Sequence, residues 1–147
     1  MPIPELNADG VLPAGIHACT LAELGQRFGL FQLSDRRVRL FEQLRDLAQE
    51  EQAAGLALEM FVDGSFTTAK PEPGDIDLVI VLPADYNPGV ELPPFKYNAI
   101  SKRGIQRRYP FDVFVVTANS TAYFKWVDFY QQIKGSKLRK GILRVTL

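Results

Sequence analysis

Residues 61–82 contain the pattern that most restricts the fold of this chain. An apolar run ends in Gly64-Ser65, a polar loop follows, and Asp75-Ile76-Asp77 then begins a second apolar run. A short continuous apolar run is typical of a strand buried on both faces, because a strand with one wet face alternates apolar and polar residues. The runs 56–62 and 76–82 are therefore predicted to be strands, and the second is predicted to be central in its sheet.

Size and composition favour one globular domain, 1–147. Of the 147 residues, 46% are hydrophobic and 23% are charged, which is ordinary for a chain with a packed core. The apolar runs are far shorter than the roughly 20 residues that cross a bilayer, and the first residues do not resemble a signal peptide. Cys19 is the only cysteine, so a disulfide framework and a cysteine-rich zinc site are excluded. We expect a cytoplasmic protein without a membrane partner.

Helix caps, glycines and apolar periodicity predict the order of the elements. The assigned segments are an irregular arm that has room for one short extended piece (1–18), helices (19–55), a sheet core (56–117), and a C-terminal helix with a basic tail (118–147).

Finer boundaries follow from the same signals. Thr20 and Glu23 form a capping-box pattern before a short helix, and a longer helix is expected to end at about Ala54. The later elements are predicted as a short helix (95–103), a basic connector (103–110), a strand (111–117), a helix (120–134) and a last strand (141–147).

Charge is unevenly distributed, although the formal net charge is zero. Residues 1–95 hold 15 of the 17 acidic side chains, and residues 96–147 hold 11 of the 17 basic ones. The C-terminal third is therefore a candidate surface for phosphates, RNA or an acidic partner, and pairing between the two halves is the alternative. For the cluster at 134–140, a solvated helix end is the simpler interpretation.

Three carboxylates are candidate metal ligands. Asp75 and Asp77 lie two residues apart at the start of a strand, so their side chains point to the same face, and Asp112 lies near the start of the next predicted strand. If those strands are neighbours in register, the three carboxylates meet at one edge of the sheet. Adjacent like charges favour a cation between them, and two Mg²⁺ ions suit such oxygen ligands. The simpler alternative is a carboxylate pair that caps a turn.

The turn before these carboxylates is a candidate phosphate-binding element. Gly64 and Ser65 offer backbone N–H groups and a hydroxyl, and Lys70 adds a positive charge on the same loop. Asp112 is also expected to accept the proton of an attacking hydroxyl.

Gly64-Ser65, nine intervening residues, Asp75-Ile76-Asp77 and the later Asp112 together resemble the polymerase-beta-type nucleotidyltransferase superfamily, especially its minimal bacterial and archaeal members. The resemblance implies an α+β fold with a mixed sheet backed by helices, here with an N-terminal helical extension. It also implies two Mg²⁺ ions and transfer of NMP from an NTP, with ATP the expected donor, to a hydroxyl of a protein or RNA. Minimal members commonly have an arginine after Gly-Ser, where this chain has Phe66.

The same resemblance implies partners. Some minimal members are antitoxins that AMPylate a HEPN-type ribonuclease toxin, and others are toxins that modify tRNA ends. A toxin–antitoxin protein or tRNA is therefore the expected partner. The alternative function is a catalytically weak or inactive nucleotidyltransferase-fold antitoxin or binding module that acts by protein or RNA contact. A metal-dependent nuclease is a third option.

Overall fold

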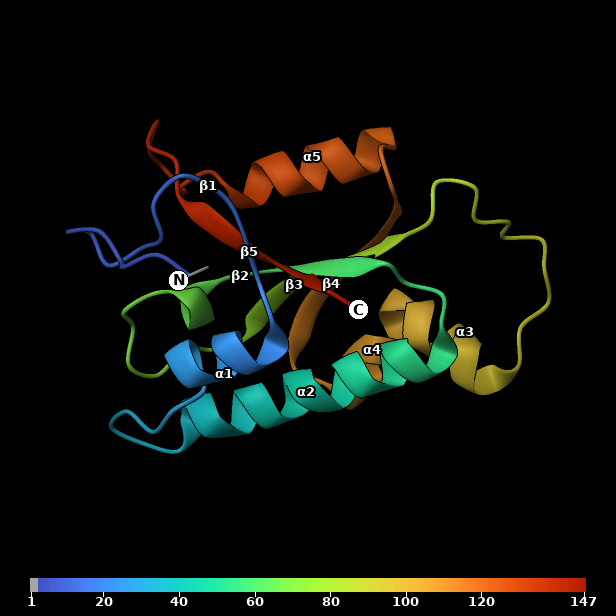
Figure 1. Cartoon of the computed structure of the whole chain (residues 1–147), viewed down its shortest axis with the longest axis horizontal. Helices are drawn as coiled ribbons and strands as arrows, with labels where there is room; N and C mark the ends of the chain where they lie inside the picture. Colours follow the sequence, from blue (N-terminus) through green and yellow to red (C-terminus); the bar gives the residue numbers. More distant parts are fainter. Residues whose placement is uncertain (1–2) are drawn as a thin grey trace.

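The structure, a computed structural model that describes residues 3–147, has an α+β fold with a mixed five-stranded sheet (Figure 1). In chain order the elements are β1 Gly15–Cys19, α1 Leu21–Phe28, α2 Arg36–Ala54, β2 Glu59–Asp63, the 3₁₀ helix η1 Ser65–Thr67, β3 Ile76–Leu82, α3 Pro94–Ile100, α4 Lys102–Arg108, β4 Phe111–Thr117, α5 Thr121–Tyr130 and β5 Gly141–Thr146. Among the described residues, no helix is long and apolar enough to cross a membrane.

The sheet has the strand order β1-β5-β2-β3-β4. β2 pairs antiparallel with both β3 and β5, whereas β3 pairs parallel with β4 and β1 pairs parallel with β5. β3 thus lies between β2 and β4, inside the sheet, as its continuous apolar sequence predicted. The first residues of β4 lie beside the first residues of β3, because parallel strands start at the same end of the sheet.

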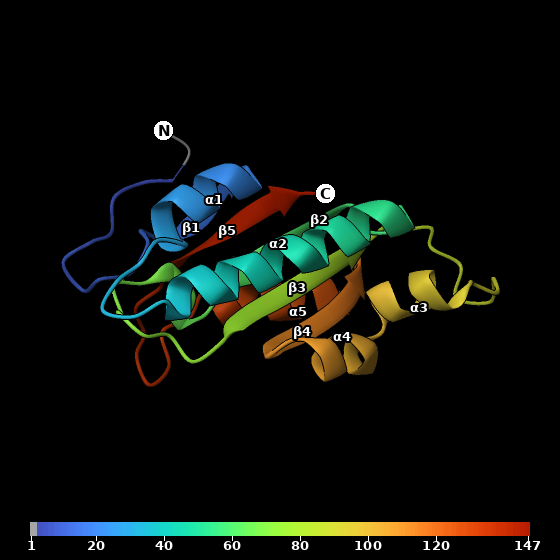
Figure 2. The same cartoon turned by 90° about the horizontal axis from the view of Figure 1, so that it is seen from below.

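Helices cover the two faces of the sheet unequally. α1 and α2 lie against one face, with α4 beside them, and α5 lies alone against the other (Figures 1 and 2). Alternate residues of β3 serve the two sides, since Leu78 belongs to the larger hydrophobic cluster and Val79 to the smaller one.

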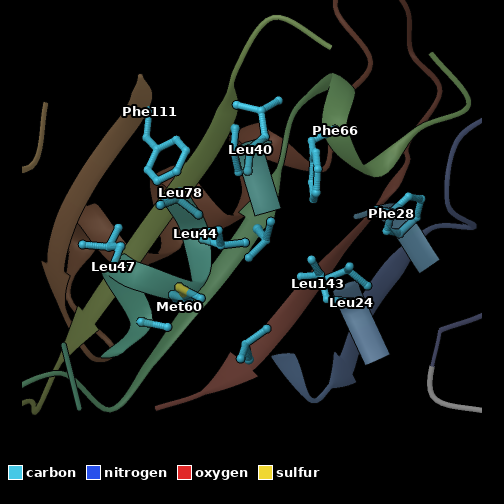
Figure 3. Packing of buried hydrophobic residues seen from close by; sticks show 14 of the residues in the cluster. Leu24, Phe28, Leu40, Leu44, Leu47, Met60, Phe66, Leu78, Phe111 and Leu143 are labelled. Carbon is cyan, nitrogen blue, oxygen red and sulfur yellow. The ribbon is translucent and has the colours of Figure 1, made fainter. Parts of the chain in front are cut away.

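The larger cluster forms the main core. Figure 3 shows Leu40, Leu44 and Leu47 of α2 above the sheet, with Phe66 pointing from η1 into the same core. Phe66 is fully buried, and its ring lies 6.2 Å from that of Phe28 between centroids. The segment that follows Gly64-Ser65 is therefore anchored in the core by its first side chain.

Several predicted boundaries are confirmed. The Thr20 hydroxyl accepts a hydrogen bond from the Glu23 backbone N–H at 3.1 Å, and the Glu23 carboxylate accepts one from the Thr20 N–H at 2.9 Å, so the capping box forms. α2 ends at Ala54 as predicted, and Gly55 follows it at φ 67°. The bounds of β3 and β4 also match the prediction.

The short extended piece that the prediction allowed within the arm 1–18 is β1, which begins at Gly15 and pairs with β5. Two other predictions were wrong. Most of the supposed connector 103–110 is helix α4, which Ser101 caps by accepting from the Gly104 N–H at 3.1 Å and which Ile105 anchors in the core. The last helix ends at Tyr130, short of residue 134.

Candidate functional site

Three neighbouring strands carry aspartates side by side at one end of the sheet. Asp63 is the last residue of β2, Asp77 is the second of β3 and Asp112 is the second of β4. The register pairs Asp63 with Asp77 and Asp77 with Asp112. Residues directly opposite each other point to the same face, so the three form a row on the face that α5 covers. The strands of Asp77 and Asp112 are thus neighbours in register, as the predicted convergence requires.

Charge and burial at this row act most strongly on Asp77. Its pKa is raised to about 7, chiefly because burial disfavours the carboxylate. The negative charges of Asp75, Asp63 and Asp112 raise the pKa further, in that order of size, and Lys140 opposes them. Asp75 itself is exposed and lies just before β3. Three neighbouring carboxylates therefore disfavour the negative charge of Asp77, a repulsion that a bound cation would relieve.

The fourth carboxylate, Asp63, is buried and paired with a lysine. The Lys140 ammonium lies 3.0 Å from Asp63 Oδ2, while Asp63 Oδ1 has no hydrogen-bond partner among the described residues. Burial raises the pKa of Asp63 to about 6, a value that already includes the smaller, opposite effect of the nearby Lys140. One oxygen of a buried carboxylate is thus left to accept a further donor or a cation.

Gly64 fits closely against the carboxylate row. Its φ of 93° lies in the left-handed region that favours glycine, and a Cβ at this position would lie 3.1 Å from Asp77 Oδ2 and 3.2 Å from the Asp77 backbone N. Ser65 follows as the first residue of η1 and is half-buried. The Gly-Ser turn therefore directly adjoins Asp77, and a larger residue in place of Gly64 would push the two apart.

Two arginines of α2 hold the loop that leads from this turn to Asp75. Buried Arg37 donates to the carbonyls of Phe66 at 2.6 Å and Thr68 at 2.7 Å, and also to that of Lys70. The preceding Arg36 donates to the Pro73 carbonyl at 2.7 Å and to that of Gly74. The loop between the two halves of the motif is thus fixed from α2 by charge-assisted hydrogen bonds.

Lys70 differs in position from the other predicted site residues. Its side chain is exposed, and its backbone carbonyl is bound by Arg37. The cation whose charge acts on Asp63 and Asp77 is Lys140, from the far end of the chain. The structure therefore brings Gly64, Ser65 and the aspartates together, and it does not place Lys70 among them.

A cavity of about 600 Å³ opens beside the carboxylate row. Its lining combines two carboxylates with two lysines and two aromatic rings: Val11, Asp63, Asp77, Phe129, Tyr130, Gln132, Ile133, Lys134, Gly135, Ser136 and Lys140. Burial, and then the charges of the four aspartates, raise the pKa of the Tyr130 hydroxyl, which keeps it neutral. The cavity lining thus contains both carboxylates and ammonium groups, and one pair of them, Asp63 and Lys140, is in contact.

The donors at the row are carboxylate oxygens, a set that suits Mg²⁺ or Mn²⁺ better than softer metals. Over residues 3–147, no group of three or more His, Cys, Asp or Glu side chains is close enough together to hold a metal ion. The unpartnered, buried Asp63 Oδ1 is a donor atom of the required kind. The chemistry of the row fits a hard divalent cation, and the two-ion site remains a prediction.

Sequence reasoning missed three residues of this site. Asp63 directly precedes the Gly-Ser turn at the end of a strand, and that position was a usable signal. Lys140 was assigned to a solvated helix end, but only 17% of its side chain is exposed. Arg37 lies at the start of α2 and shows no local sign of its loop contacts.

The chain belongs to a protein family described as "Family of unknown function (DUF6932)", whose model matches residues 4–146. That range contains every helix and strand of the structure, together with the carboxylate row and Lys140. No curated protein and no solved structure matches the chain significantly.

Proposed function

We propose that this chain is a Mg²⁺-dependent nucleotidyltransferase of the polymerase-beta type, which transfers NMP from an NTP to a hydroxyl of a protein or RNA. ATP is the proposed donor. The supporting observation is the register of Asp77 with Asp112, next to a Gly64-Ser65 turn that touches Asp77. The mixed sheet with helices on both faces agrees with the fold of that superfamily.

In this proposal Asp75, Asp77 and Asp112 hold the metal, which when bound polarises the phosphate and lowers the pKa of the attacking hydroxyl. Asp112 accepts the proton of that hydroxyl. The Gly64 and Ser65 backbone N–H groups and the Ser65 hydroxyl bind the outer phosphates. A bond forms from the acceptor oxygen to the α-phosphorus, the bond to the bridging oxygen breaks, and pyrophosphate leaves.

The resemblance of the motif to minimal members also supports a role as a toxin–antitoxin component, with a partner protein or tRNA as the acceptor. Label transfer from [α-³²P]ATP, CTP, GTP and UTP tests the reaction, with Mg²⁺, cellular RNA and the protein encoded beside this gene as acceptors. We expect transfer by the wild type and none by Asp77→Asn. The exposed acid Asp85 provides the control Asp85→Asn, which should retain transfer. Absence of transfer with all four nucleotides would contradict the proposal.

A second candidate function is an RNA-binding module that acts without catalysis. Helix α4 carries Lys102, Arg103 and Arg107, none of which has an ion-pair partner within residues 3–147. The Lys102 ammonium lies 4.0 Å above the Phe114 ring, and Phe114 stacks on Trp126 at 3.7 Å between centroids. Unpaired cations beside stacked aromatic rings at an edge strand suit single-stranded RNA.

Fluorescence anisotropy with a single-stranded RNA distinguishes this candidate. Replacing Lys102, Arg103 and Arg107 by glutamine should weaken binding and flatten its salt dependence, while Arg45→Gln on exposed α2 surface should change neither. RNA binding that survives Asp77→Asn, with no label transfer by the wild type, would favour the contact-only function.

A further inference from the structure

The loop after Gly64-Ser65 presents no cation to the cavity. Phe66 takes the position where minimal nucleotidyltransferases commonly have arginine, and its ring is fully buried in the core on the α2 side. Further along, Arg37 binds the backbone of Thr68 and Lys70, and Lys70 does not line the cavity. A polyphosphate bound beside the carboxylate row therefore needs its positive partner from elsewhere in the chain.

Lys140 occupies a suitable position. Two backbone hydrogen bonds fix the chain around it, from the Lys140 N–H to the Gln131 carbonyl at 2.8 Å and from the Gly141 N–H to the Leu12 carbonyl at 2.9 Å. Its side chain is mostly buried, lines the same cavity as Asp77 and contacts Asp63 Oδ2 at 3.0 Å. An ammonium group has three N–H donors, so the contact with Asp63 leaves donors for a ligand in the cavity.

We infer that Lys140 is the phosphate-binding cation of this site, held toward the cavity by Asp63 and assisted at the rim by Lys134. The ligand class is a nucleoside polyphosphate, whose phosphates enter the cavity next to Asp77. This inference rests on the proposed function for the identity of the nucleotide, but phosphate binding itself can be measured without turnover. Asp63 acts here as a positioning residue.

The cavity has the size and charge for this ligand. Its volume of about 600 Å³ falls within the roughly 300–1,000 Å³ typical of small-molecule sites. Lys134 and Lys140 line one part of it, and Lys134 is exposed and has no ion-pair partner within the described chain. Phe129, 52% exposed, also lines it and is an aromatic side chain of the kind on which bases stack.

The competing explanation is that Lys140 serves only to neutralise buried Asp63. Lys140→Met alone would then leave Asp63 uncompensated and disturb folding. The double variant Asp63→Asn/Lys140→Met removes both charges together and is the informative variant for binding. Lys137, exposed on the same segment and outside the cavity lining, provides the matched control Lys137→Met.

The test is calorimetric titration of the full chain with inorganic tripolyphosphate, ATP with Mg²⁺, and adenosine. We expect the wild type to bind tripolyphosphate and ATP, and the double variant to bind each about tenfold or more weakly while adenosine binding is unchanged. Lys140→Arg should retain most of the phosphate affinity, and Lys137→Met should match the wild type. Lys70→Met should also match it.

Three results would overturn the inference: a wild type that does not bind tripolyphosphate, a folded double variant with wild-type phosphate affinity, or an equal loss in Lys137→Met. The results that test this inference can be distinguished from those that test the proposed function. Lys140-dependent phosphate binding without label transfer would support the inference and contradict the proposed reaction. Label transfer and phosphate binding that are both insensitive to the double substitution would contradict the inference alone.

Discussion

The two faces of the sheet are built from the same strands, yet they differ in cover and in chemistry. On one face, Ile76 and Leu78 of β3 are fully buried in the core that the strands form with α1, α2 and α4. On the other face, Asp77 lies between them in sequence and is only half-buried, because the ten-residue helix α5 ends at Tyr130 and leaves the carboxylate row beside a cavity. Stability is thus expected to depend mainly on the α2 face, and activity on the α5 face.

The difference between the faces shows how β3 can contribute to the core and to the candidate site at the same time. A strand alternates its side chains, so every second residue can be polar without disturbing the opposite core. At the end of α5, Asp77 and Asp112 remain partly solvated and buried Asp63 has Lys140 as a partner, whereas an unpaired carboxylate under α2 carries the full cost of desolvation. Substitutions on the two faces should therefore separate activity from stability.

The largest difference between an effect on activity and an effect on stability is expected for Asp112, on the α5 face. Asp112→Asn should lower label transfer by about 100-fold or more, since the variant loses a proposed metal ligand and proton acceptor. Its free energy of unfolding should change by less than about 1 kcal/mol, because the substitution relieves repulsion with Asp77. Transfer assays and urea denaturation measure the two effects. A variant that keeps full activity, or that unfolds, would remove the proposed division between the faces.

On the α2 face, Arg37→Met should lower the free energy of unfolding by about 2–4 kcal/mol, because it leaves several loop carbonyls without their donor. Arg39→Met is the matched control. Arg39 is exposed and pairs only with Asp35 at 2.8 Å, so its loss should change stability by less than about 1 kcal/mol. Equal effects of the two substitutions in urea denaturation would show that the loop is not held from α2.

The smallest of the predicted effects concerns a second buried charged residue of α2, Glu51. Glu51 is fully buried, neither of its carboxylate oxygens has a hydrogen-bond partner among the described residues, and burial raises its pKa to about 8. The folded state therefore binds the Glu51 proton more tightly than the unfolded state does. The contribution of Glu51 to stability is fully present below about pH 4.5 and is lost as the pH rises toward 8.

Glu51→Gln should therefore raise the free energy of unfolding at pH 7 by on the order of 1–3 kcal/mol and remove this part of the pH dependence. Denaturation curves between pH 5 and 8 measure both changes. The exposed Glu42 on the same helix gives the control Glu42→Gln, for which no change of slope is expected. Asp63 and Asp77 also contribute to the slope in this range, so a slope as steep in Glu51→Gln as in the wild type would contradict the assignment.

Local signals predicted much of this molecule. The capping box at Thr20, the glycine at position 55 and the apolar run of β3 each act within a few residues, and the structure confirms all three. The prediction allowed a short extended piece in the first 18 residues but gave neither its bounds nor its partner, because β1 pairs with β5 at the other end of the chain. It missed α4 because basic residues and a glycine obscured a single buried apolar residue, Ile105.

The candidate site shows the same contrast between local signals and long-range pairing. Strand alternation and order along the chain predicted that Asp77 and Asp112 lie side by side, and the register of β3 with β4 agrees. Lys140 lies 77 residues from Asp63 along the chain, so their ion pair depends on how β5 and β2 pair and has no local signature. Long-range pairing of this kind requires the folded structure.

The central claim is that the carboxylate row binds a divalent cation, and electron paramagnetic resonance of Mn²⁺ tests it most directly. Mn²⁺ accepts the same oxygen ligands as Mg²⁺, and its free signal falls when it binds protein. The account predicts that the wild type and Asp85→Asn reduce the free signal equally, while Asp77→Asn and Asp112→Asn bind about tenfold or more weakly. Failure of the wild type to bind Mn²⁺, or equal binding by Asp77→Asn, would contradict it.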